Sequence, residues 1–262
     1  DTIDGKEMWF RRGVGNFFLL NNEDFKSENA AEKKSTNNYY AKFYNEAMNC
    51  LADYNNLRNP HKWQLTFNLK VNANAIPDGD TLRVWLPFPM ETTRQTNVKF
   101  LKSSDPIKVS QGTFHTTAYM EGVAHKDQPT NFSITYSFVS HEQHFTRADI
   151  MSSLKPYDTS SELYKQYTAE EYPHIIKTEK LKKLAHTIVG EEKNPVLQAS
   201  MIYDWIATNF PWAGAREYST IPNIPEYVVE NSHGDCGQVA LLYITLVRCL
   251  GIPARWESGF ML

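Results

Sequence analysis

The sequence is short of the features that mark several large protein classes. Its 262 residues include only three cysteines, Cys50, Cys236 and Cys249, too few for a disulfide framework and without the paired spacings of a structural zinc site. No apolar run approaches the roughly 18 residues that a membrane-spanning helix needs. The 27 basic and 30 acidic residues give a formal net charge of −3, too mild for a nucleic-acid surface. We therefore expect no metal, no cofactor, no transmembrane segment and no nucleic-acid partner.

Two parts of the chain carry different periodicities, which predicts an α+β fold. From Trp63 onward apolar residues alternate with polar ones, as on a half-buried strand, and the same alternation recurs around residues 82–86, 98–100 and 132–138. Short strands at these separations favour a β-sandwich domain over residues 63–150. Before it, apolar residues at helical spacing from Phe43 to Tyr54 predict an amphipathic helix, so residues 1–62 are expected to form an N-terminal helical segment.

Beyond residue 150 the pattern becomes helical, and residues 151–262 are expected to form a further domain. One helix is predicted to end at Gly190, and a second to begin after Asn194 as N-cap with Pro195 at its first position. The apolar face of the second helix consists of Val196, Ala199, Ile202, Tyr203, Ile206 and Phe210. A third helix is predicted to open near Cys236, with a buried stripe formed by Val239, Tyr243, Leu246, Val247 and Leu250.

The candidate chemistry lies at the start of this third helix. Unpaired backbone N–H groups and the positive end of the helix dipole favour a thiolate at Cys236 and could also hold an oxyanion. Sites of this kind lower a cysteine pKa from about 8.5 to roughly 3.5–7.5, which makes sulfur a nucleophile at neutral pH. The alternative is that Cys236 packs as a small hydrophobe. Gly234 and Gly237 favour chemistry because they leave the backbone beside the sulfur open, whereas Cys249 is expected in the core and Asp235 as the helix cap.

This segment resembles the transglutaminase-like superfamily. The matching residues are Gly234-Asp235-Cys236, then Ala240, Leu241 and Leu242, then residues 246–255, preceded by residues 199–206 and 209–212. The resemblance covers about residues 160–262. It implies that residues 151–262 are the helical, N-terminal part of a papain-like transglutaminase core, with Cys236 as nucleophile. It also places Trp212, Tyr218 and Gly237 at the acyl cleft or oxyanion site.

The resemblance implies a Cys-His-Asp triad that transfers an acyl group from an amide of a peptide or protein. We expect hydrolysis by a cysteine peptidase or amidase rather than crosslinking, since bacterial-looking relatives with an added β domain are more often thought of as hydrolases. The alternative is a catalytically inactive relative that acts as a binding or scaffold module. The reactivity of the Cys236 thiol distinguishes the two alternatives, because only a nucleophile needs an activated cysteine.

The triad is expected to be incomplete within this sequence. In the family the His and Asp follow on strands after the nucleophile helix, and only 26 residues follow Cys236, of which Ala254, Trp256, Ser258 and Phe260 alternate like a first strand. We expect truncation after Leu262, with the missing portion supplying both partners. His233 lies in the same loop as Cys236, a poor origin for a base. The compartment stays open, with an extracytoplasmic location, periplasmic or surface, slightly favoured over the cytoplasm.

Overall fold

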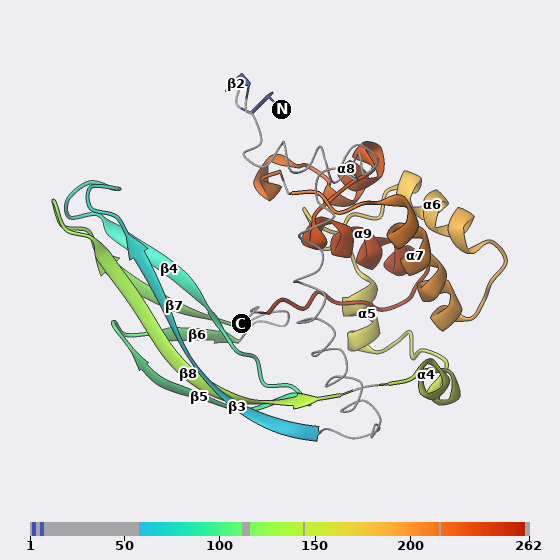
Figure 1. The fold of residues 1–262 in the computed structure, drawn as a ribbon, viewed down its shortest axis with the longest axis horizontal. Coiled ribbons are helices and arrows are strands. Elements are labelled where there is room, and N and C mark those ends of the chain that lie inside the picture. Colours follow the sequence, from blue (N-terminus) through green and yellow to red (C-terminus); the bar gives the residue numbers. More distant parts are fainter. Residues whose placement is uncertain are drawn as a thin grey trace, which may run out of the picture. The chain divides into compact units, whose positions relative to one another are not determined.

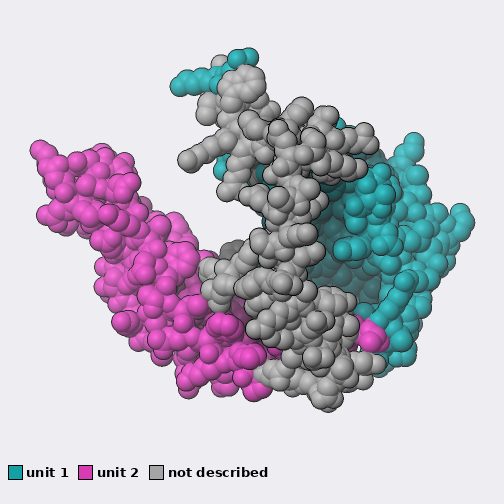
Figure 2. Space-filling view, in the orientation of Figure 1, with its two compact units in different colours: residues 1–44, 147–262 teal, residues 45–146 magenta. Residues whose placement is uncertain are grey.

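The computed structural model describes residues 2–3, 6–7, 58–111, 116–143, 145–214 and 216–259. The predicted helix from Phe43 to Tyr54 and the third cysteine, Cys50, lie outside these residues. The chain divides into two compact units, residues 1–44 with 147–262 and residues 45–146 (Figure 2). Both helices and antiparallel sheets are present, so the α+β class is confirmed. Within the described residues, every helix is too short or too polar to cross a membrane.

The β unit contains two antiparallel sheets of three strands each (Figure 1). The first has the order β3-β8-β5, with β3 at Arg58–Val71, β8 at Thr130–Glu142 and β5 at Gln95–Ser103. The second has the order β4-β7-β6, with β4 at Thr81–Phe88, β7 at Thr116–Val123 and β6 at Lys108–Gln111. A separate short pair, β1 (Thr2–Ile3) and β2 (Lys6–Glu7), lies near the amino terminus.

One apolar core joins the two larger sheets, as in a sandwich. The second sheet contributes Val84, Leu86, Ala118 and Met120, and the first contributes Phe132, Ile134 and Tyr136. The strands predicted from alternation are present as β3, β4, β5 and β8, whereas β6 and β7 were not predicted. The inward positions of β7 include Ala118 and Gly122, small residues that carry little hydrophobic signal.

The helical unit contains six described α-helices and one 3₁₀ turn. They are α4 (Arg147–Ser153), α5 (Glu162–Thr168), α6 (Glu179–Val189), α7 (Pro195–Asn209), η1 (Tyr218–Thr220), α8 (Ile224–Asn231) and α9 (Cys236–Cys249). The predicted end of α6 and the predicted start of α7 are confirmed. Gly190 follows α6 with a positive φ of 53°, and the Asn194 side chain accepts from two backbone N–H groups at the start of α7.

Helix α9 lies among the other helices of its unit, and α6, α7 and α8 all pack on it (Figure 1). Its buried residues are Gln238, Leu241, Leu242, Ile244, Thr245, Leu246, Val247 and Arg248. Of the predicted stripe, Leu246 and Val247 are buried, whereas Val239, Tyr243 and Leu250 are only partly buried against the core. Tyr203 was predicted on the buried face of α7, and this is wrong, because its side chain is 65% exposed. Ile202 and Ile206, which were predicted on the same face, are buried in the core of the helical unit. An apolar body with a polar hydroxyl tolerates either environment, so Tyr203 gave a false core signal.

The predicted strand from Ala254 onward is wrong for the described residues. Residues 253–259 belong to no strand, and Phe260 lies outside the described part. A strand requires a neighbouring strand to share its ladder of hydrogen bonds, and the described residues place none beside this segment. The Ala254 N–H instead donates to the carbonyl of Tyr167, next to the end of α5. The segment therefore follows the helices rather than a sheet.

Candidate active site

The start of α9 is built by a capping box around Cys236. Asp235 is the N-cap, and its Oδ1 accepts a 2.8 Å hydrogen bond from the backbone N–H of Gln238. The Gln238 side chain accepts in return from the Asp235 N–H at 3.1 Å. This reciprocal pair fixes the first turn and leaves Cys236 as the first helical residue. The predictions that Cys236 begins a helix and that Asp235 caps it are confirmed.

The thiols of Cys236 and Cys249 lie in different environments. Cys236 is exposed at the amino-terminal end of α9, where the backbone N–H groups point outward. Cys249 ends the same helix, packs against the apolar core of this unit, and burial raises the pKa of its thiol to about 11. A buried thiol with a raised pKa is a poor nucleophile, while an exposed sulfur at a helix start has the placement of a reactive one. The expected contrast between the two cysteines is therefore present.

Tyr218 lies against this helix start. Its hydroxyl donates a 2.5 Å hydrogen bond to Oδ1 of Asp235. Burial raises the pKa of Tyr218 well above its usual range, and the Asp235 carboxylate raises it further, so the hydroxyl stays protonated and remains a donor. Gly237 is needed here, because a Cβ at that position would collide with the Tyr218 hydroxyl. Tyr218 and Gly237, two of the three residues predicted at the cleft, thus lie at the start of the helix that begins at Cys236.

Trp212 reaches the same region through the backbone. Trp212 and Gly234 form an isolated parallel bridge, and the Ala213 N–H donates to the Gly234 carbonyl at 3.0 Å. Trp212 is 47% exposed, and its bridge partner Gly234 directly precedes Asp235, the N-cap of α9. The structure therefore brings Cys236, Gly237, Tyr218 and Trp212 to one end of α9. Their catalytic roles stay predictions.

Sequence reasoning missed Trp256 as a site residue. The Cη2 atom of its ring lies 3.4 Å from where a Cβ of Gly237 would stand, so the ring lies beside the turn that begins at Cys236. The ring is 39% exposed. Its place in the apolar alternation of residues 254–260 was visible in the sequence, but that pattern gave no indication of which element the ring would contact.

None of the described histidines hydrogen-bonds to Cys236. His233 is the nearest in sequence, and its Nδ1 lies 2.8 Å from the Asn231 carbonyl, which can only accept, so Nδ1 carries the proton. The ring also packs edge-on against Tyr227. Local contacts therefore hold His233, consistent with the expectation that it is not the base. In the described part of the chain, no group of three or more His, Cys, Asp or Glu is placed to bind a metal.

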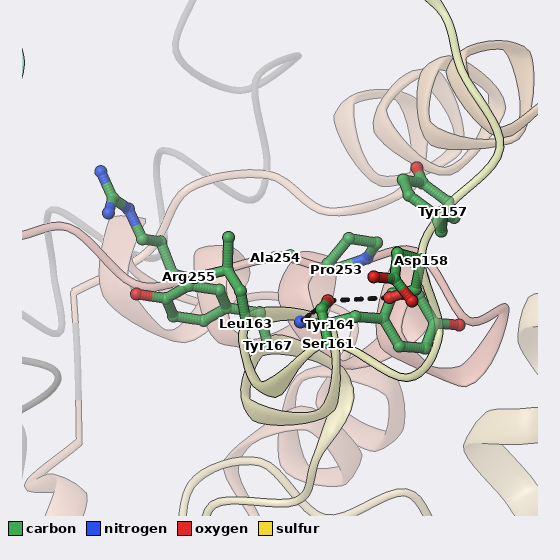
Figure 3. A pocket seen from close by; sticks show the side chains of 9 residues that line it. All are labelled: Tyr157, Asp158, Ser161, Leu163, Tyr164, Tyr167, Pro253, Ala254 and Arg255. Atoms are coloured by element: carbon green, nitrogen blue, oxygen red, sulfur yellow. Dashed lines mark hydrogen bonds between the residues drawn. The ribbon is translucent and has the colours of Figure 1, made fainter.

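A pocket of about 400 Å³ lies further along the helical unit (Figure 3). Its lining comes from the turn before α5, from α5 itself and from residues 253–255. Cys236 is not among the lining residues, so the pocket does not enclose the candidate nucleophile. The two regions are connected through the chain, since Arg255 lines the pocket and the next residue, Trp256, contacts Gly237.

Two solved structures are similar to this chain, and the first of them supports the fold. The crystal structure of a "Putative Cysteine Protease" from Cytophaga hutchinsonii is similar with a TM-score of 0.52 and 17% identity over 76% of this chain and 66% of that one. That of a "Putative Protease" from Parabacteroides distasonis has a TM-score of 0.29 and 12% identity over 72% of this chain and 35% of the other. The chain thus spans less than two thirds of either protein's length.

Similarity at 17% identity supports the fold alone. No curated protein matches the chain. The family model described as the transglutaminase-like superfamily matches residues 182–262, which contain most of α6, all of α7, α8 and α9, and the whole candidate site. The resemblance based on Gly234-Asp235-Cys236 and residues 246–255 is therefore confirmed, since residues 182–262 match the model of the transglutaminase-like superfamily.

Proposed function

We propose that Cys236 is the nucleophile of a thiol-dependent acyl transfer on amide bonds of a peptide or protein. The observation that carries this proposal is the exposed sulfur of Cys236 at the first position of a capped helix. The thiolate attacks the amide carbonyl carbon, and the carbonyl oxygen becomes an oxyanion that backbone N–H groups of α9 can bind. The carbon–nitrogen bond then breaks, the amine leaves with a proton, and a thioester remains on sulfur.

Water completes the proposed reaction by attacking the thioester, which yields a carboxylic acid and restores the thiol. We propose this hydrolysis rather than transfer to a second amine. A histidine that accepts the thiol proton and donates it to the leaving amine, and a carboxylate that orients this histidine, are required. We propose that both come from chain outside the described residues, since no described histidine hydrogen-bonds to Cys236.

The hydrogen bond from Tyr218 to Asp235 supports thiolate formation. A bare carboxylate beside Cys236 would oppose a negative sulfur. Here Oδ1 of Asp235 accepts from both the Tyr218 hydroxyl and the Gln238 backbone N–H. Two donors on one oxygen partly neutralise its charge, so the cap can hold the helix start at a smaller electrostatic cost to the thiolate.

Alkylation with iodoacetamide tests the proposal. We expect Cys236 to react faster than Cys249 and Cys50 in the native protein near neutral pH, as followed by mass spectrometry of the labelled peptides. The second candidate function is a catalytically inactive relative that presents a binding surface, which the lack of a described histidine partner for Cys236 favours. Equal and slow labelling of all three cysteines would support that function and contradict the proposed enzyme.

A further inference from the structure

Arg248 is a fully buried cation at the far end of the nucleophile helix. Its side chain is 0% exposed, and its Nη1 lies 2.6 Å from Oε1 of Glu171 in an ion pair. The same Nη1 donates to the Ala169 carbonyl at 2.8 Å. A guanidinium offers five N–H donors in a rigid fork, which can bind several acceptors at once. Arg248 thus joins α9 to the chain between α5 and α6.

The remaining donors of Arg248 hold the segment that follows α9. Nε and Nη2 donate to the Ala254 carbonyl at 2.9 and 2.6 Å. The Ala254 N–H is also fixed, by a 3.0 Å hydrogen bond to the Tyr167 carbonyl. Both backbone groups of Ala254 are therefore bound, and one partner is a charged group shielded from water, where hydrogen bonds are strongest. This arrangement determines where the chain runs next.

Two residues later the chain brings Trp256 to the start of α9. The indole lies 3.4 Å from where a Cβ of Gly237 would stand, and 39% of the Trp256 surface is exposed. Gly237 directly follows Cys236, so this partly exposed ring lies beside the first turn of the nucleophile helix. An exposed indole offers a flat apolar face, on which an aromatic or branched side chain can pack.

We propose that Trp256 is a specificity-determining wall of the Cys236 site, selecting acyl groups with an aromatic or branched apolar side chain, and that Arg248 is its positioning residue. The proposal rests on the proposed thiol chemistry. Arg248 does not touch substrate in this account. It acts through Ala254, whose position fixes how the Trp256 ring faces the sulfur.

The specificity role of Trp256 can be tested with two alkylating reagents that share the same reactive group and differ in shape. The rate at Cys236 is measured with iodoacetamide and with N-benzyl iodoacetamide, and their ratio cancels the intrinsic reactivity of the thiol. We expect the benzyl reagent to react about two- to tenfold faster, as aromatic packing predicts. Trp256→Ala should bring the ratio to about one, and Trp256→Phe should restore part of it. Trp85→Ala, which removes an exposed indole from the other compact unit, is the matched control.

Two milder variants test the positioning role. Glu171→Gln removes the ion pair but keeps the shape, and Arg248→Lys keeps the charge but loses the fork. Both should lower the ratio while the rate with iodoacetamide stays within about twofold. A thermal unfolding shift without any change in ratio would mean that Arg248 is merely structural and would overturn its positioning role. An unchanged ratio in Trp256→Ala would overturn the wall. Slow labelling of Cys236, no faster than Cys249, would instead contradict the proposed function, and this inference with it.

Discussion

The Tyr218 hydroxyl donates to the same Asp235 oxygen that caps the helix beginning at Cys236. This contact joins η1 to α9 across 17 residues and places a protonated phenol beside the candidate nucleophile. It also explains the residue at position 237, because the hydroxyl occupies the space that a side chain there would need. Tyr218, Asp235 and Gly237 are therefore coupled, and a substitution at one of them should alter the contacts of the others.

Gly237→Ala should destabilise the protein, although replacing glycine by alanine within a helix usually stabilises it. In a helix, alanine is more stable than glycine by about 1 kcal/mol. Here the new methyl would collide with the Tyr218 hydroxyl, so we expect a loss of about 1–3 kcal/mol in the free energy of unfolding, as for other overpacked sites. Urea unfolding measures this loss, and iodoacetamide labelling of Cys236 should slow because the cap is disturbed.

Tyr218→Phe provides the control for that collision, since it removes only the hydroxyl. In this background Gly237→Ala should cost much less than in the native protein. An equal cost in both backgrounds would show that the collision is not the cause.

Cys249 should make stability depend on alkaline pH. Burial raises the pKa of its thiol from 9.0 to about 11, so the folded protein holds this proton while the unfolded chain releases it. The contribution is fully present below about pH 9 and is lost as the pH rises towards 11, by up to about 2 kcal/mol. Urea unfolding at pH 8 and pH 10.5 should show a smaller decline for Cys249→Ser than for the native protein. Cys236→Ser, which removes the exposed thiol, is the matched control; a change of equal size there would contradict the assignment.

Truncating Met120 should destabilise the β unit more than truncating Val123, an exposed residue on the same strand. Its side chain is 0% exposed in the core between the two sheets, whereas Val123 on the same strand is 48% exposed. Met120→Ala should lower the free energy of unfolding by about 2–5 kcal/mol, because it leaves a cavity. Val123→Ala should change it by no more than about 0.5 kcal/mol. Similar losses for both would indicate that the two sheets do not share this core.

Local chemistry explains what the sequence could predict. The caps at Asn194 and Asp235 use acceptors within three residues of the N–H groups that they bind, so short patterns revealed the starts of α7 and α9. Strands β3, β4 and β8 showed clear alternation because one face of each is apolar.

Distant partners explain what was missed. Arg248 lies among apolar residues of its helix, and its acceptors include Ala169, 79 residues away. Trp256 follows Ala254, whose carbonyl accepts from the same arginine. The segment after Ile252 alternated like a strand, yet pairing requires a neighbour that local pattern cannot supply. The helix start at Cys236 and its neighbours Tyr218 and Gly237 were therefore predictable from the sequence, and the place of Trp256 was not.

Trapping the thioester tests the central claim most directly. The protein would be mixed with a peptide p-nitroanilide, quenched in acid and digested, and the peptides analysed by mass spectrometry. The account predicts an acyl adduct on the peptide that contains Cys236, removable by hydroxylamine and absent in Cys236→Ala. Release of p-nitroaniline that persists in Cys236→Ala, or an adduct on Cys249 rather than Cys236, would contradict it.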